Sequence, residues 1–136
     1  MTPRRPLLLA AVLGASGVAL GAYRAHGLDR WLERVAPPED VAKRLEHAQT
    51  AVTYQLFHAL ALLALAALLA QRPSRALRAA VGLFTLGVVL FSGGLYLNVF
   101  AGTLGHWAIV PSGGLCLIAG WVAVGAAALR RWDAGA

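Results

Sequence analysis

Four long apolar runs fill most of this chain, and none of them contains an acidic residue. They cover residues 6–23, 53–70, 79–101 and 107–129 of a 136-residue sequence. An α-helix of about 18 residues or more is long enough to cross the roughly 30 Å hydrocarbon core of a bilayer. The sequence therefore predicts an all-α integral membrane protein, a single domain folded as an antiparallel four-helix transmembrane bundle.

The charge pattern supports a membrane location. Charged residues make up 13% of the chain, about half the share in an ordinary soluble domain. The net charge is +6, but the basic residues cluster beside the spans, where they act as topology signals and contact lipid head groups. We therefore expect the lipid bilayer as a partner and no nucleic acid. The single cysteine, Cys116, lies inside the fourth run and excludes an intrachain disulfide.

The first run permits two interpretations. Arg4 and Arg5, the apolar stretch behind them and the small residues near Gly21 resemble a secretory signal peptide. On the other hand, Gly14, Gly17 and Gly21 interrupt the segment on a GxxxG-like face. This spacing favours packing against another helix, and hence a retained first span.

The basic residues also predict an orientation. An even number of spans places both termini on one side, together with seven arginines near span ends: Arg4, Arg5, Arg72, Arg75, Arg78, Arg130 and Arg131. The other side carries five basic residues dispersed along a loop with five acids: Arg24, Arg30, Arg34, Lys43 and Arg44. Basic residues favour the cytoplasm. Together with a composition rich in Ala, Gly and Arg, this predicts a bacterial inner-membrane protein with both termini in the cytoplasm.

The loop after the first span contains its own helical pattern. Leu28, Trp31, Leu32 and Val35 recur at helical spacing, with charged residues between them. We expect a short amphipathic helix at about residues 28–36 that lies in the membrane interface. The next helix should begin near residue 39, after the two prolines, and continue into the second span.

Polar residues gather in one half of the predicted bilayer. Because the spans alternate in direction, the polar positions at the end of one span and the start of the next share a depth. The cluster comprises His26, Tyr54, Gln55, His58, Ser92, Tyr96, Asn98 and Ser112. The other half is almost wholly apolar. Buried polar groups are costly in a membrane, so any functional site is expected in this polar half.

His58 has two interpretations within that cluster. It could serve as a ligand, proton-relay or metal residue, or it could be a neutral histidine hydrogen-bonded to a neighbouring helix. His47 lies about 16 Å along the same helix, too far away to share a metal ion with His58. The sequence has no metal-binding motif, and no acid lies inside a span to complete a catalytic triad. We therefore expect no metal, no cofactor and no enzymatic activity.

Several glycines are predicted to allow close contact between helices. They are Gly17, Gly21, Gly93, Gly94, Gly113 and Gly114. In the fourth run, Pro111 lacks a backbone donor, so we expect an irregular start over residues 107–110 and a regular helix from Pro111.

Four segments resemble the small membrane proteins grouped as domain of unknown function 423, whose animal relatives are called transmembrane protein 256. The segments are GAYRAHGL at 21–28, AVTYQLFHAL at 51–60, FSGGLY at 91–96 and PSGG at 111–114. The family usually has Gly in place of Arg24 and Ser in place of Gly94. Because Arg24 lies at the turn after the first span, no family role of that turn is carried over to this chain. The resemblance covers nearly the whole chain. It implies a small four-span inner-membrane protein and brings no established activity or catalytic residues.

Three functions remain open from the sequence. The first is a non-enzymatic accessory, assembly or structural membrane subunit, with a homo-oligomer or a membrane-protein complex as its partner. It rests on the glycine-rich helix faces and the small size of the chain. The second is a small transporter or channel, although the proton-coupled kind needs an acid within the membrane. The third is a protein that binds a lipophilic cofactor, quinone or haem, near His58 and Tyr96.

Overall fold

Five α-helices make up the computed structural model, which describes residues 2–103 and 106–132, with side chains up to residue 129. They are α1 (Arg4–His26), α2 (Leu28–Val35), α3 (Pro38–Gln71), α4 (Arg75–Ala101) and α5 (Ile109–Trp132). All except α2 are long and apolar enough to cross a membrane. The predicted all-α membrane protein with four spans is confirmed.

Prolines fix two of the helix starts. Pro38 occupies the first turn of α3, where its missing N–H would have no partner in any case, and Glu39 and Asp40 follow it at the positive end of the helix. α5 begins at Ile109, so Pro111 lies in its first turn. The regular helix thus includes Ile109 and Val110, which we had expected to be irregular.

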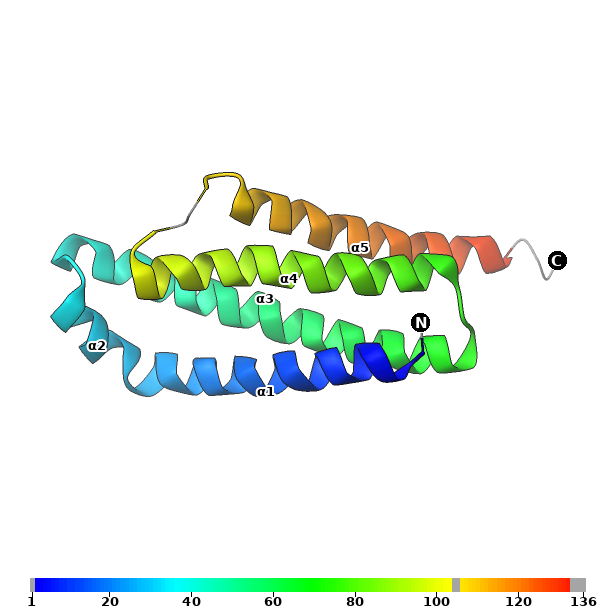
Figure 1. Cartoon of the computed structure of the whole chain (residues 1–136), viewed down its shortest axis with the longest axis horizontal. Coiled ribbons are helices and arrows are strands. Elements are labelled where there is room, and N and C mark those ends of the chain that lie inside the picture. The colour runs from blue at the N-terminus through cyan, green and yellow to red at the C-terminus, as the bar shows by residue number, and fades with distance from the viewer. Residues whose placement is uncertain (1, 104–105, 133–136) are drawn as a thin grey trace.

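The four spans are arranged in an open row. α1 packs on α3, α3 on α4, and α4 on α5, whereas within the described residues α1 and α5 make no extensive contact. Figure 1 shows α1 and α5 on opposite sides, with α3 and α4 between them. The burial of the spans agrees with this order, because 44% of the residues are buried in the spans of α3 and α4, against 17% in α1 and 22% in α5. The two outer helices therefore face mainly lipid.

Two apolar clusters hold this row together. The larger one joins α1, α3, α4 and α5 around Phe84, which is fully buried. The smaller one joins α2 to α3 and α4 through Leu28, Leu32, Ala48 and Val99. The amphipathic spacing of α2 thus buries its leucines against the protein.

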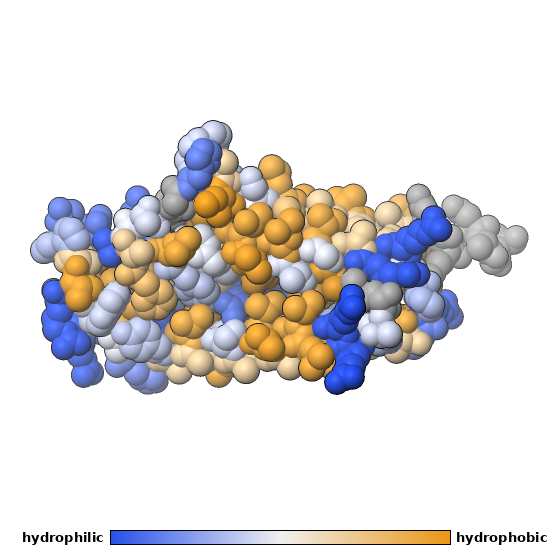
Figure 2. Space-filling view, viewed as in Figure 1, coloured by the Kyte–Doolittle hydropathy of each residue, from blue (hydrophilic) through white to orange (hydrophobic). Residues whose placement is uncertain are grey.

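The outer surface matches a bilayer. On the face shown in Figure 2, hydrophobic residues cover the middle of the molecule and hydrophilic residues lie towards its two ends. The start of α1 and the end of α5 lie at the same end as the turn between α3 and α4 (Figure 1). At the other end, α2 lies beside the first turns of α3.

Candidate functional site

Gln55 lies at the centre of the polar half and connects three helices. Its side-chain nitrogen Nε2 donates to the carbonyl oxygen of Leu13 at 2.9 Å and to Oγ of Ser16 at 2.8 Å, both on α1. Its oxygen Oε1 accepts a hydrogen bond from the hydroxyl of Tyr96 on α4 at 2.9 Å. Because Gln55 is buried, these partners replace the water that its amide loses.

The network continues to the backbone of α1. The hydroxyl of Ser16 donates to the carbonyl of Val12 at 2.7 Å, four residues earlier in the same helix. Both amide protons of Gln55 and the hydroxyl protons of Ser16 and Tyr96 are therefore used within the protein. This set of hydrogen bonds, here called the Gln55 network, connects α1, α3 and α4. The hydroxyl oxygens of Ser16 and Tyr96 still have lone pairs that could accept a further hydrogen bond.

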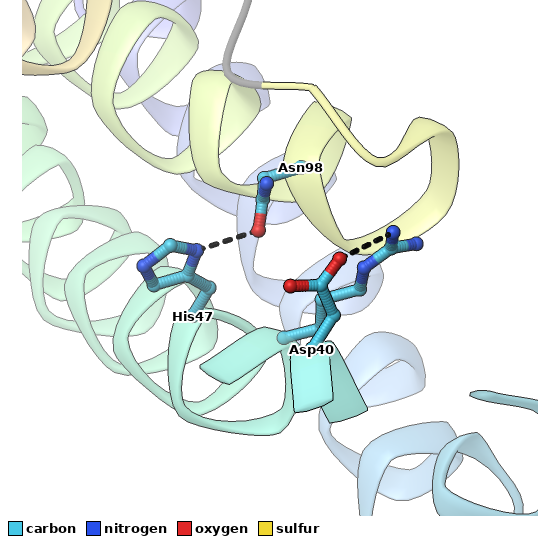
Figure 3. A network of polar contacts seen from close by, with 4 residues as sticks. Asp40, His47 and Asn98 are labelled. Carbon is cyan, nitrogen blue, oxygen red and sulfur yellow. Dashed lines mark hydrogen bonds and ion pairs between the residues drawn. The ribbon is translucent and has the colours of Figure 1, made fainter. Parts of the chain in front are cut away.

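A second polar connection lies closer to the membrane surface. Nδ1 of His47 and Oδ1 of Asn98 are 2.8 Å apart, and since an amide oxygen only accepts, the histidine donates. Arg44 lies 3.4 Å from the Asp40 carboxylate one turn away. Figure 3 shows both pairs at the point where α3 meets the end of α4. The His47–Asn98 bond holds the projecting start of α3 against α4, whereas the Arg44–Asp40 pair lies within α3.

Arg44 also borders the end of α4. Gly102 caps that helix in the left-handed conformation, with φ of 72°, and a Cβ at this position would lie 2.8 Å from Nη2 of Arg44. The positive guanidinium therefore lies at the negative end of the helix dipole, a favourable position.

His58 is buried in aromatic surroundings. Its Nδ1 lies 2.8 Å from the carbonyl oxygen of Tyr54, which can only accept, so the other ring nitrogen, Nε2, carries the lone pair in the neutral form. The His58 ring packs against Phe84, at a centroid distance of 5.1 Å, and against Trp121, at 6.1 Å. This hydrogen bond runs within α3, so the interpretation of His58 as a histidine bonded to a neighbouring helix is wrong. Nε2 is buried without a hydrogen-bond partner.

A groove, here called the α1–α4 groove, opens beside the Gln55 network. It has a volume of about 320 Å³ and lies between α1 and α4. Its polar lining consists of Ser16, Gln55, Ser92 and Tyr96, and the rest is apolar apart from Gly93. The Ser92 side chain is fully buried, and its Oγ has no hydrogen-bond partner.

The predicted polar cluster is only partly brought together. Gln55, Ser92 and Tyr96 line one groove, while Asn98 pairs with His47 outside it. The other predicted members lie elsewhere: His58 within the aromatic cluster, Tyr54 half-exposed against His58 and Phe91, and His26 and Ser112 exposed.

The predicted glycines also divide into two groups. Five lie close to another helix or its side chains: Gly17 and Gly21 face α3, Gly94 faces Val110 and Ile109 of α5, and Gly113 and Gly114 face Phe91. A Cβ on Gly113 would overlap the backbone of Phe91, so α4 and α5 meet there at backbone distance. Gly93 differs, because nothing lies within 4 Å of its Cβ position. It borders the groove and packs against no helix.

Sequence reasoning did not identify Ser16 or the partner of Asn98. Ser16 is the only serine or threonine in the first apolar run, and it lies about two turns before the end of that run. A single small polar residue at that depth in an apolar span was the signal that could have identified Ser16 as a hydrogen-bonding residue. Among the described residues, no three His, Cys, Asp or Glu side chains gather as a metal site requires. The arrangement offers hydrogen bonds and an apolar lining, a combination suited to binding.

Comparison with known proteins identifies relatives of the same size. Residues 20–114 match the family described as "Protein of unknown function (DUF423)". The UPF0382 inner membrane protein YgdD of Escherichia coli is 40% identical over 134 residues, covering 96% of this chain and 95% of the relative. A UPF0382 membrane protein of Haemophilus influenzae is 40% identical over 119 residues, covering 87% and 88%.

The similarity extends to more distant bacteria. The UPF0382 membrane protein YwdK of Bacillus subtilis is 34% identical over 126 residues, covering 91% of this chain and 95% of the relative. No solved structure shows a significant match. Four membrane-spanning helices, full-length relatives named as membrane proteins and a family match over most of the chain agree with one another. This chain is therefore an integral membrane protein that belongs to the DUF423 family.

Proposed function

We propose that this protein is a non-enzymatic accessory or assembly subunit of the bacterial inner membrane, which binds a transmembrane helix of another chain along α1. The observation that carries the proposal is a second groove, on the α3 side of α1, called the α1–α3 groove. Its volume is about 400 Å³, and small residues of α1 line it, namely Ala10, Ala11 and Gly14.

Gly14 is what makes this surface suitable for a helix. Gly17 and Gly21 are used inside the molecule against α3, whereas nothing lies within 4 Å of a Cβ at Gly14. Small residues let two helix backbones approach closely, which is the main source of packing energy between helices in lipid. The side chains around Gly14 are apolar and offer no group for acid–base chemistry.

The distribution of ionisable groups supports a non-enzymatic role. No carboxylate lies in any of the four apolar runs, and the polar side chains of the Gln55 network use their protons within the protein. A general base or nucleophile would need a free partner at hydrogen-bond distance. The names of the relatives describe membrane proteins and no reaction.

A photo-crosslinking experiment tests the proposed helix contact. Val18 lines the α1–α3 groove and is 63% exposed, so a photoreactive amino acid placed there would reach the occupant. After irradiation in native membranes, we expect a protein adduct. A protein adduct of about twice the 14.2 kDa chain mass would identify a second copy, and a protein adduct of any other mass would identify a different subunit.

The control is a matched pair of glycine substitutions. Gly14→Leu fills the groove and is expected to lower the yield of the adduct at least fivefold. Gly125→Leu on α5 also enters open space but lies away from this groove, so the yield should stay unchanged. Adducts with lipid alone, or a yield unaffected by Gly14→Leu, would contradict the proposal.

We also infer that both termini face the cytoplasm. The seven arginines near span ends on the terminal side include Arg72, Arg75 and Arg78, which lie at the turn between α3 and α4. On the opposite side, basic residues are interspersed with acids. This asymmetry is the one that orients inner-membrane proteins.

A further inference from the structure

The side of the protein that holds the start of α1 carries arginines without acidic partners. The five acids of the described residues lie in α2 and the first part of α3, on the opposite side. Arg5 is exposed, and in the described part of the chain its side chain makes no hydrogen bond or ion pair. The N–H donors of its guanidinium are therefore available to a group from outside the chain.

The helix dipoles of α1 and α4 add to this positive charge. Both helices begin on this side, so their positive ends point to it (Figure 1). Neither first turn contains an acid, and neither N-cap residue makes a side-chain hydrogen bond. Arg5 and Arg78 lie instead within the first four residues of α1 and α4. Because the dipoles and the side chains have the same sign, both would stabilise an anion bound there.

An apolar groove between α1 and α4, here called the Arg5 groove, begins at this charged end. It has a volume of about 390 Å³ and is lined, besides Arg5, by Leu9, Val81, Gly82, Thr85, Leu86 and Val89. Gly82 is exposed, and nothing lies within 4 Å of its Cβ position. The hydroxyl of Thr85 donates to the carbonyl of Val81 at 2.7 Å, so it offers no free proton. Beyond Arg5, the lining therefore suits a hydrocarbon chain.

The length of the groove matches one leaflet of a bilayer. Arg78 lies on α4 one turn before Gly82 and on the same face of the helix. Its Nε donates to the carbonyl of Ser74 at 3.4 Å, which leaves its two terminal nitrogens for another partner. Arg78 and Val89 are eleven residues apart, or about 16 Å along the helix. Half of the hydrocarbon core is about 15 Å thick, close to this length.

We propose that the Arg5 groove binds one anionic phospholipid, with its phosphate beside Arg5 and Arg78 and an acyl chain along the apolar lining. Basic pockets between membrane helices are known to bind such head groups. A zwitterionic head group would bring a positive group to the same arginines, so the negative net charge is the selected property. The proposed helix contact does not enter this inference, because that contact uses the α1–α3 groove on the other side of α1.

Two photoactivatable lipids that differ only in their head group test the proposal. The full chain is placed in phosphatidylcholine nanodiscs that contain a small share of either phosphatidylglycerol or phosphatidylcholine with a diazirine in one acyl chain. Peptide mass spectrometry locates the adducts after irradiation. We expect the phosphatidylglycerol probe to label residues 5–9 and 81–89 at least tenfold more than the phosphatidylcholine probe does, while both label α5 equally. Equal labelling of the groove by the two probes would overturn the proposal.

Charge variants test the role of the arginines. Arg5→Gln and Arg78→Gln should each lower the head-group preference about fivefold, as expected for one basic residue at a membrane surface. Arg30→Gln on α2 removes the same charge at the opposite end of the molecule, so the preference should stay unchanged. Arg5 and Arg78 are both exposed, so their replacement should not disturb the fold, and circular dichroism checks this. An unchanged preference in Arg5→Gln would refute the assigned phosphate position.

Glycine variants test the apolar lining separately. Gly82→Leu fills the Arg5 groove and should lower labelling of residues 81–89 by the phosphatidylglycerol probe at least fivefold. Gly125→Leu on α5 also enters open space and should have no effect. Gly14→Leu, which is expected to block the proposed helix contact, should leave lipid labelling unchanged, so the two proposals can fail independently. Full labelling in Gly82→Leu would show that the acyl chain lies outside the groove.

Discussion

Gln55 shows how one side chain can organise a small membrane protein. Its amide bonds to α1 on one side and to α4 on the other, so the polar contacts among three helices all pass through this one residue. In the bilayer core no water is present to replace a lost hydrogen-bond partner, so a polar group that loses its partner stays without one. The conformation of the polar half should therefore depend strongly on this residue.

Replacing Gln55 by Leu should destabilise the fold. The change leaves the carbonyl of Leu13 and the hydroxyl of Tyr96 without their present partner. Hydrogen bonds between membrane helices contribute about 0.6 kcal/mol on average and up to about 1.7 kcal/mol. For three bonds we expect a loss of about 1–3 kcal/mol in the free energy of unfolding. Denaturation in mixed micelles, followed by circular dichroism, measures this loss.

Gln49→Leu is the matched control on the same helix. Gln49 is exposed and bonds only to Thr53 within α3, so its replacement should change stability by less than about 0.5 kcal/mol. Equal stability of the Gln55 and Gln49 variants would show that the Gln55 network does not hold the helices together.

At the scale of elements, α2 is the clearest example of a pattern that the sequence carried. The spacing of Leu28, Trp31, Leu32 and Val35 indicated a helix with one apolar face, and the structure has α2 at Leu28–Val35. We had expected that face to lie in the membrane interface. On that face, Leu28 and Leu32 are buried against α3 and α4, while Val35 is 55% exposed. A periodic pattern shows which side is apolar but not what covers it.

Leu32→Ala should release α2 from the rest of the protein. Leu32 is fully buried, and in soluble cores such a truncation costs about 2–5 kcal/mol. Since α2 has only eight residues, we expect its local unfolding, seen as faster amide hydrogen exchange over residues 28–36, while the spans stay protected. Val35→Ala should leave exchange unchanged. Uniform slow exchange in both variants would contradict the docking of α2.

Helix contacts beyond single elements were harder to predict from the sequence. Depth along the spans correctly brought Gln55 and Tyr96 to one level, since it follows from length and direction alone. The partner of Asn98 and the role of Ser16 depend on how each helix is rotated about its axis. In lipid, apolar residues occur on every face of a span, so the sequence carries little information about that rotation.

At the scale of the whole molecule, the open row decides which surfaces are available. A closed bundle would hide one face of every helix at a common centre, whereas here α3 and α4 are the buried pair and α1 and α5 are the edges. The sequence predicted four antiparallel spans but not this order, because hydrophobicity alone cannot distinguish burial in protein from exposure to lipid. The grooves described above result from this arrangement.

The inferred orientation has a direct test at this scale. If the termini face the cytoplasm as inferred, a green fluorescent protein fused after residue 136 should fluoresce, and alkaline phosphatase fused at the same site should be inactive. Phosphatase inserted after Pro37, between α2 and α3, should be active in the periplasm. The reverse pattern would overturn the orientation without affecting the fold.

The length of α3 gives the protein two dissimilar sides. At 1.5 Å per residue its 34 residues extend about 50 Å, some 20 Å more than the hydrocarbon core requires. α2 is docked against this extra length, and His47 bonds it to Asn98 of α4, so the excess forms an ordered projection above the bilayer, here called the ledge. Among the described residues, the opposite side has a short arginine-rich turn, the start of α1 and the end of α5. A water-soluble protein approaching from the ledge side would meet a shaped platform, whereas one approaching from the other side would meet little more than positive charge.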